Sequence, residues 1–226
     1  MRDWLVLRLH APLMAFGAVA IDQVGQTWDT PGSSMLTGLL ANALGWDWDD
    51  REAHQALQDR LAHGTAALGG GETLTDMQNA QLAKTDRGWT TRGAPEGRTG
   101  ASYDAPHRRR RDFVADADLL IVLTLDGDGA LSVSDLARAL DRPARPLFIG
   151  RKPCLPACHL LDGRLQAQTV HEALLAALAG RPATQMTWPE NEGPPGDRVE
   201  ERADLRVWSS GLHGGTRRIS RAEAER

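Results

Sequence analysis

The chain has 226 residues, of which 41% are hydrophobic and 25% charged, with a formal net charge of −4 at pH 7. A chain of this length can bury a core without disulfides or structural metals. Its two cysteines exclude a disulfide-rich extracellular scaffold. No stretch reaches the roughly 18 apolar residues of a membrane span. Charged residues interrupt the apolar N-terminus, so we expect it to belong to the mature protein. We therefore expect a globular cytoplasmic protein.

Charge is unevenly distributed along the sequence. Residues 81–112 hold eight Lys or Arg and four Asp or Glu, a local charge of +4, which leaves −8 on the remainder. Residues 142–161 hold four cations and no acid, whereas acids gather in 46–52 and 189–204. Segregation of this kind indicates a basic surface on an acidic body, although solvated loops of mixed sign are an equally ordinary explanation.

The first part of the chain predicts one strand and two helices. Residues 4–9 are apolar nearly throughout, as in a central strand covered on both faces. A helix is expected over 33–45, because Ser33 or Ser34 can cap its first turn and apolar residues recur at helical spacing. Residues 50–63 predict a second, more polar helix.

The middle of the chain predicts a split βαβ arrangement. We expect strands over 73–79, 116–129 and 146–149, and a helix over 132–143 that begins with a capping box. The long basic arm over 81–111 is either functional or disordered. This order is typical of ferredoxin-like and RNA-recognition-motif folds. A doubly wound parallel sheet fits less well, because no Gly-rich dinucleotide turn follows the first strand.

The sequence changes character after residue 160. A helix over 169–180 is followed by Pro- and Gly-rich acidic linkers and by short strand candidates at 185–188 and 205–208. We therefore predict an α+β protein with one domain over 1–160 and a small β-rich subdomain over 161–226.

The stretch FIGRKPCLPAC, residues 148–158, carries the clearest binding signal. Gly150 permits close backbone approach, and Arg151 and Lys152 follow it directly, which suits a phosphodiester chain. The stretch lacks the first glycine and the Ser/Thr of a P-loop, and an ordinary basic turn is the competing interpretation. Its two cysteines lack the partners of a four-ligand zinc site. We expect inert thiols and neither a metal nor another cofactor.

Four consecutive arginines lie at the end of the basic arm: Arg108, Arg109, Arg110 and Arg111. Such a block repels itself unless anions lie nearby, so it indicates a polyanionic partner. A solvated charge run is the commoner explanation of such a block. His107, just before it, is the best acid–base candidate among the seven histidines, with Lys84 and Tyr103 in the same arm.

Four stretches, taken together and in this order, resemble one protein family: LVLRLHAPLMAFG, PGSSMLTGLLANALG, RRRRDFVADADLLIVLTL and FIGRKPCLPA. Over about residues 3–160 the chain resembles the CasD family of type I-E Cascade subunits, which act in bacterial CRISPR antiviral defence within the RAMP superfamily. The resemblance implies a ferredoxin-like palm, a thumb over 81–111 and a small C-terminal β region. It also implies a non-catalytic protein that holds the 5′ handle of the crRNA and caps the backbone filament.

The resemblance also implies partners and site residues. The partners are the crRNA handle, the filament and large subunits of the complex, and target DNA through that complex. The helix start is expected to offer free amides to phosphate. The RNA-binding residues carried over by position, or placed in the arm, are Ser33, Ser34, Arg108, Arg109, Arg110, Arg111, Gly150, Arg151 and Lys152.

Two alternatives stay open. Type I-C relatives cut repeat RNA without a metal, and Lys84, Tyr103 and His107 could supply the base and acid of such an endoribonuclease. In type I-E systems a separate subunit cuts, which favours binding alone. A general RNA-recognition protein outside defence is less well supported, because LLIVLTL offers no aromatic ring for base stacking.

Overall fold

The computed structural model describes residues 1–19, 22–81, 106–223 and the backbone of 88–89 and 95–96. The described residues form a seven-stranded antiparallel sheet in the order β10-β1-β9-β4-β11-β15-β12. Its strands, in chain order, are β1 (Arg2–His10), β4 (Leu61–Gly69), β9 (Asp118–Leu125), β10 (Leu161–Ala167), β11 (Gln185–Pro189), β12 (Arg198–Arg202) and β15 (Arg217–Glu223). The mixed α+β class expected from the sequence is confirmed.

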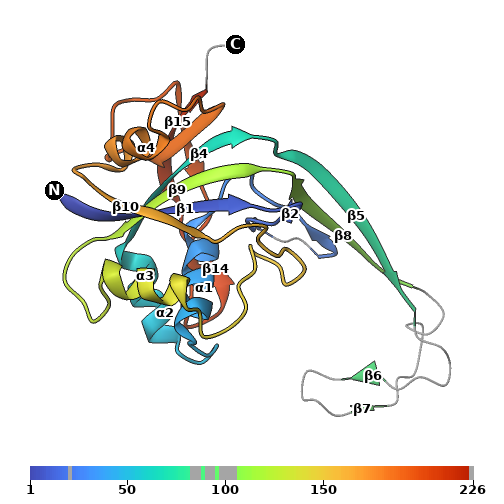
Figure 1. Ribbon diagram of the computed structural model, residues 1–226. Helices are drawn as coiled ribbons and strands as arrows, with labels where there is room; N and C mark the ends of the chain where they lie inside the picture. Colours follow the sequence, from blue (N-terminus) through green and yellow to red (C-terminus); the bar gives the residue numbers. More distant parts are fainter. Residues whose placement is uncertain (20–21, 82–87, 90–94, 97–105, 224–226) are drawn as a thin grey trace.

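Both faces of this sheet are covered, because side chains of β1 alternate between two separate cores. Leu5, Leu7 and Leu9 pack on one face, whereas Trp4 and Val6 pack on the other. The first core lies against three helices, and the second lies against one (Figure 1). These helices are α1 (Ser33–Leu44), α2 (Arg51–Arg60) and α3 (Val133–Asp141) on the first face, and α4 (Val170–Leu178) on the second.

The glycine expected after α1 and the capping box expected at the start of α3 are confirmed, whereas the serine cap expected at the start of α1 is wrong, because the N-cap residue is Gly32 and has no side chain. Gly45 follows α1 in the left-handed conformation at φ +81°, where a side chain would be strained. Ser132 and Asp135 form the expected capping box at the start of α3, each side chain bonding the other residue's backbone amide.

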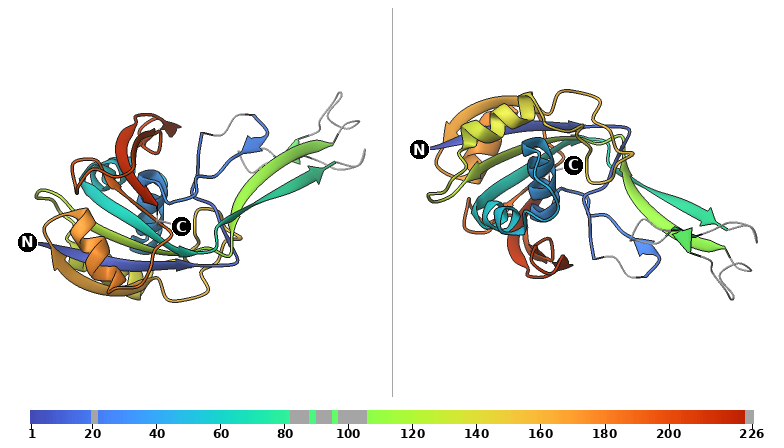
Figure 2. Two further views of the ribbon diagram at one scale, coloured as in Figure 1. Left: turned by 90° about the horizontal axis from the view of Figure 1, so that it is seen from above. Right: turned by 90° about the horizontal axis from the view of Figure 1, so that it is seen from below.

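A two-stranded ribbon projects away from the sheet (Figure 2). It consists of β5 (Glu72–Ala80) and β8 (His107–Ala115), paired antiparallel along their whole length. Two short strands also pair with β8: β2 (Leu13–Met14) with the end of β8 nearer the sheet, and β3 (Val24–Gly25) with its middle. The predicted strand over 73–79 therefore belongs to the ribbon rather than to the main sheet. The expectation of an irregular arm over 81–111 is also partly wrong, because residues 107–111 belong to strand β8 and pair with β5.

Four strands of the main sheet were missed in the sequence, namely β4, β10, β12 and β15. β4 has the sequence LAHGTAALG, whose small residues give little strand propensity, and it follows α2 without a turn. The strand expected at 146–149 does not form. That segment is irregular, with the Ile149 amide donating to the Cys154 carbonyl at 2.8 Å, and the strand beside β1 is β10 instead. The boundary expected after residue 160 falls just before β10, and the sheet continues beyond it.

The remaining strands are short. β6 (Gly88–Trp89) pairs with β7 (Pro95–Glu96), and β13 (Arg206–Val207) pairs with β14 (Leu212–His213). Lys84 and Tyr103, the other candidates for acid–base chemistry, lie outside the described residues. Among the described helices, none combines the length and the hydropathy needed to cross a membrane.

Candidate RNA-binding site

A pocket of about 370 Å³ lies where α1, the turn around Gly150 and strand β13 meet. It brings together three residues expected in the RNA-binding site, namely Ser34, Gly150 and Arg151. Two further lining residues, Arg206 and Trp208, come from beyond residue 160. The pocket therefore joins segments from both predicted parts of the chain.

Gly150 is needed for a close approach within the protein itself. Its φ is +84°, and a Cβ built there would lie 1.5 Å from the carbonyl oxygen of Ala15. The neighbouring Ala15 amide donates to the Ile149 carbonyl at 3.2 Å. No residue other than glycine fits this position. The sequence predicted a close backbone approach at Gly150, and one is present, but the chain that approaches is the protein's own backbone after β1.

Arg151 is largely committed to holding the site together. Its two terminal nitrogens donate to the carbonyls of Asp112 and Gly25, each at 3.0 Å, and its guanidinium lies 4.7 Å from the centre of the Phe113 ring. Burial lowers the pKa of this guanidinium. Lys152, the next residue, is exposed and makes no side-chain hydrogen bond or ion pair within the described part of the chain. Of the two predicted cations, Lys152 has the freer donors.

The amides at the start of α1 are not free, so this part of the prediction is wrong. Asp204 occupies them: its carboxylate accepts from the Ser33 amide at 3.3 Å, and its carbonyl accepts from the Ser34 amide at 3.0 Å. The same carboxylate pairs with Arg217 at 2.8 Å. A buried helix start requires acceptors, and here the chain supplies its own anion.

The side chain of Ser33 is also committed. Its hydroxyl lies 2.9 Å from Nε2 of His63 on β4, and both residues are buried. Burial, together with the charges of Arg217 and Arg202, keeps the pKa of His63 well below its usual range. The hydroxyl of Ser34 lines the pocket and makes no hydrogen bond within the described residues.

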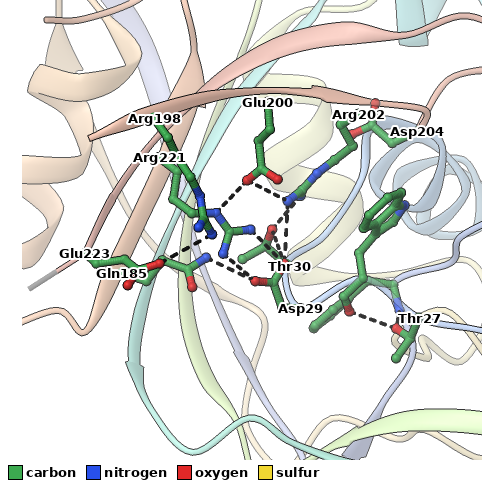
Figure 3. A network of polar contacts seen from close by, with 12 residues as sticks. Thr27, Asp29, Thr30, Gln185, Arg198, Glu200, Arg202, Asp204, Arg221 and Glu223 are labelled. Atoms are coloured by element: carbon green, nitrogen blue, oxygen red, sulfur yellow. Dashed lines mark hydrogen bonds and ion pairs between the residues drawn. The ribbon is translucent and has the colours of Figure 1, made fainter. Parts of the chain in front are cut away.

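A network of ion pairs around two buried arginines fixes the segment that leads into α1 (Figure 3). Arg202 on β12 is 2% exposed, donates to the Thr30 hydroxyl and lies 3.5 Å from the Asp29 carboxylate. Arg221 on β15 pairs with Asp29 at 2.6 Å and with Glu200 at 2.5 Å. Burial alone would raise the pKa of Asp29, but hydrogen bonding and charge from Arg221 lower it. The C-terminal strands thereby position the start of α1. We call Asp29, Thr30, Glu200, Arg202, Asp204, Arg217 and Arg221 the C-terminal clamp.

Arg206 and Trp208 are positioned by two glutamines of α2. Gln58 accepts from the Arg206 amide and from the Trp208 indole N–H, both at 3.1 Å, and Gln55 accepts from the Trp208 amide at 3.1 Å. The Arg206 guanidinium lies 5.1 Å from the Trp208 ring centre. Its buried Nε has no hydrogen-bond partner among the described residues.

The arginine block lies on β8, in the projecting ribbon. Arg108, Arg109 and Arg110 are exposed, and Arg111 is half-buried. Successive side chains of a strand point to opposite faces, so the block presents positive charge on both faces of the ribbon. Arg109 also lines a wider pocket of about 730 Å³ beside β3 and donates to the Asp22 carbonyl at 3.3 Å. Arg151 links this ribbon to the first pocket through Asp112.

Gly38 is a pocket residue that sequence reasoning missed. It lies inside α1, where glycine costs about 1 kcal/mol of stability relative to alanine. A Cβ built there would meet no atom within 4 Å outside the backbone of its own helix. Packing therefore does not require glycine at this position. An isolated glycine in a helical pattern was the available signal. Arg206 and Trp208 gave no such signal, because their pocket partners are distant in sequence.

The two cysteines differ in environment. Cys154 is free and lies in the core, and burial raises the pKa of its thiol, which disfavours the reactive thiolate. Cys158 is free and half-buried, with its sulfur 3.8 Å from the carbonyl oxygen of Arg8.

The sequence model of the family described as "CRISPR-associated protein (Cas_Cas5)" matches residues 4–220, and the chain belongs to this family. Among curated relatives, "CRISPR system Cascade subunit CasD" of Escherichia coli (strain K12) is 30% identical over 176 residues, 77% of each chain. The resemblance found in the sequence is confirmed, and the family match extends past residue 160.

Solved structures agree on the fold. A chain of a "CRISPR RNA-guided surveillance complex" matches with a TM-score of 0.69 and 21% identity, covering 97% of this chain and 89% of that one. A "Crystal structure of Cas protein" matches with a TM-score of 0.58 and 24% identity, covering 98% and 93%. At these identities the two matches show a shared fold.

Proposed function

We propose that this chain is an RNA-binding, non-catalytic subunit of a type I-E Cascade complex in the bacterial cytoplasm. It holds the 5′ handle of the crRNA and caps one end of the backbone filament in antiviral defence. Family membership and the 30% identity to a Cascade subunit support this assignment. The partners are the crRNA, the filament and large subunits and, through the complex, target DNA.

The observation that carries the proposal is the pocket lined by Ser34, Gly150, Arg151 and Arg206. It lies next to the exposed Lys152 and is joined through Arg151 to the strand that carries the arginine block. Phosphate contacts by Lys and Arg supply most of the affinity of non-specific nucleic-acid binding. Cations without carboxylate partners among the described residues lie at this pocket and on this ribbon, which suits an acidic protein to hold an RNA strand.

The arrangement of strands supports a ferredoxin-like palm. The order β10-β1-β9-β4, with α1 and α3 as the crossing helices, is that of a split βαβ unit. In this proposal the ribbon of β5 and β8 is the base of the thumb, and the strands after residue 160 form the small C-terminal region.

The proposal is tested by incubating the full chain with its own repeat RNA in EDTA and following binding and cleavage together. We expect binding without cleavage. Site-specific cleavage would instead identify the metal-independent endoribonuclease, and His107→Ala would then test its mechanism. Lys152→Ala should lower the slope of log affinity against log salt by about 0.7, the value of one phosphate contact on single-stranded RNA. Arg151→Ala is a poorer probe, because it also removes the contacts to Asp112 and Gly25.

A further inference from the structure

The pocket contains polar groups that the fold does not use. The buried Nε of Arg206 has no partner, and the guanidinium makes no side-chain hydrogen bond within the described part of the chain. The Ser34 hydroxyl is also without a hydrogen bond among those residues. Ser34 is half-buried, but the Arg206 Nε is a buried donor without a partner, which is uncommon in folded proteins and requires an explanation. A ligand with hydrogen-bond acceptors would satisfy them.

The walls of the pocket are apolar and partly aromatic. Phe16, Met35, Phe148 and Trp208 line it together with the unsubstituted backbone at Gly38. Its volume of about 370 Å³ is at the small end of the range of about 300–1,000 Å³ for small-molecule sites. This space is large enough for one ring system and too small for a helix or a duplex.

Gly38 leaves one wall open. The helix keeps its least favourable ordinary residue at a position where a larger side chain would meet no neighbour within 4 Å outside its own backbone. An added side chain would instead occupy pocket space. The glycine is explained if a flat group must lie against the backbone of α1 at this point.

We propose that this pocket receives one unstacked base of single-stranded RNA. The base lies over Gly38 among the apolar side chains, and Arg206 and Ser34 donate hydrogen bonds to its edge or to the adjoining phosphate. Proteins read single-stranded RNA by extruding bases onto aromatic and arginine surfaces in this way. The inference rests on the proposed function, and it assigns Gly38, Arg206 and Trp208 to the same site.

The test is an abasic scan of the repeat RNA. Single bases are removed in turn, and binding is measured for the wild-type full chain, Gly38→Leu and Gly38→Ala. Ala56→Leu, which adds a side chain at an exposed position of α2 outside the pocket, is the matched control. Gly38→Ala should also raise the melting temperature by about 2–4 °C, showing that substitution leaves the protein folded.

In the wild type, removal of one particular base should weaken binding about tenfold, as expected for loss of one stacked base. Gly38→Leu should bind intact RNA about tenfold more weakly and should lose the sensitivity at that position. Gly38→Ala should show the same change to a smaller extent, and Ala56→Leu should match the wild type.

Four outcomes would overturn the inference. In the first two, the wild type binds RNA with no loss of affinity on removal of any single base, or Gly38→Leu keeps the wild-type profile. In either case the pocket takes no base, while RNA binding by the chain stands. If Ala56→Leu weakens binding as much as Gly38→Leu, the effect does not arise in the pocket. If the wild type binds no RNA, the proposed function fails together with the inference.

Discussion

The C-terminal clamp and the ribbon are both rich in arginine, but they use it in opposite ways. In the clamp, Arg202, Arg217 and Arg221 are buried or half-buried, and each pairs with a carboxylate of the chain. In the ribbon, Arg108, Arg109 and Arg110 are exposed, and among the described residues one ion pair is found there, between Arg110 and Asp112 at 3.3 Å. The number of arginines in a region therefore does not identify a binding surface. What matters is whether their donors are already satisfied.

The largest expected effect is in the clamp. Arg202→Ala should lower the free energy of unfolding by about 3 kcal/mol, because it removes a buried side chain that packs on Trp28 and leaves the buried Thr30 hydroxyl without its partner, while Asp29 keeps Arg221. Urea unfolding followed by circular dichroism measures this. Arg218→Ala, which removes an exposed pair with Glu190, is the control and should cost less than about 1 kcal/mol. Equal losses in the two variants would contradict the distinction between buried and exposed arginines.

Arg151 and Lys152 repeat the comparison at adjacent positions. Arg151→Ala removes two hydrogen bonds to backbone carbonyls and the contact with Phe113, and should lower stability by about 2 kcal/mol. Lys152→Ala should change stability by less than about 0.5 kcal/mol. If Arg151→Ala is as stable as Lys152→Ala, then Arg151 does not hold the site together.

His63 makes the region beside the clamp sensitive to pH. Its pKa is lowered in the folded protein, so below the ordinary value near 6.5 the unfolded chain binds a proton that the folded protein does not. Stability is therefore fully present above pH 6.5 and declines as pH falls below it, by at most about 1.4 kcal/mol per pH unit from this group.

Unfolding free energies of the wild type and of His63→Gln between pH 7 and 5 test this. The amide of the variant can still bond Ser33 but does not titrate. A steeper decline in the variant than in the wild type would contradict the prediction.

The smallest effect on stability is expected in the ribbon. Arg108→Ala combined with Arg110→Ala should change the free energy of unfolding by less than about 1 kcal/mol, because both side chains are exposed. The same double variant should lower the salt slope of RNA binding by about 1.4 if each arginine contacts one phosphate. Fluorescence anisotropy over a range of salt concentrations measures this. An unchanged slope would remove these two residues from the RNA-binding surface.

The sequence alone determined the elements whose signals are local. Local spacing and capping residues predict the end of α1 and the start of α3. Short apolar runs predict the buried strands β1 and β9. The order of four short motifs indicates the family. The basic segments can also be recognised from the local composition of the sequence. These properties depend on residues only a few positions apart, so they can be recognised without the fold.

Which groups remain available for a ligand depends on contacts between segments that are distant in the sequence. Asp204 takes the amides at the start of α1 from 171 residues away, and Arg151 is committed to carbonyls 39 and 126 residues distant. The hydrogen bond from the Arg206 amide to Gln58, 148 residues away, helps to place Arg206 and Gly38 in one pocket. Whether a donor is satisfied depends on which distant segments fold against it. The charges and residue types along the chain do not show which distant segments contact each other.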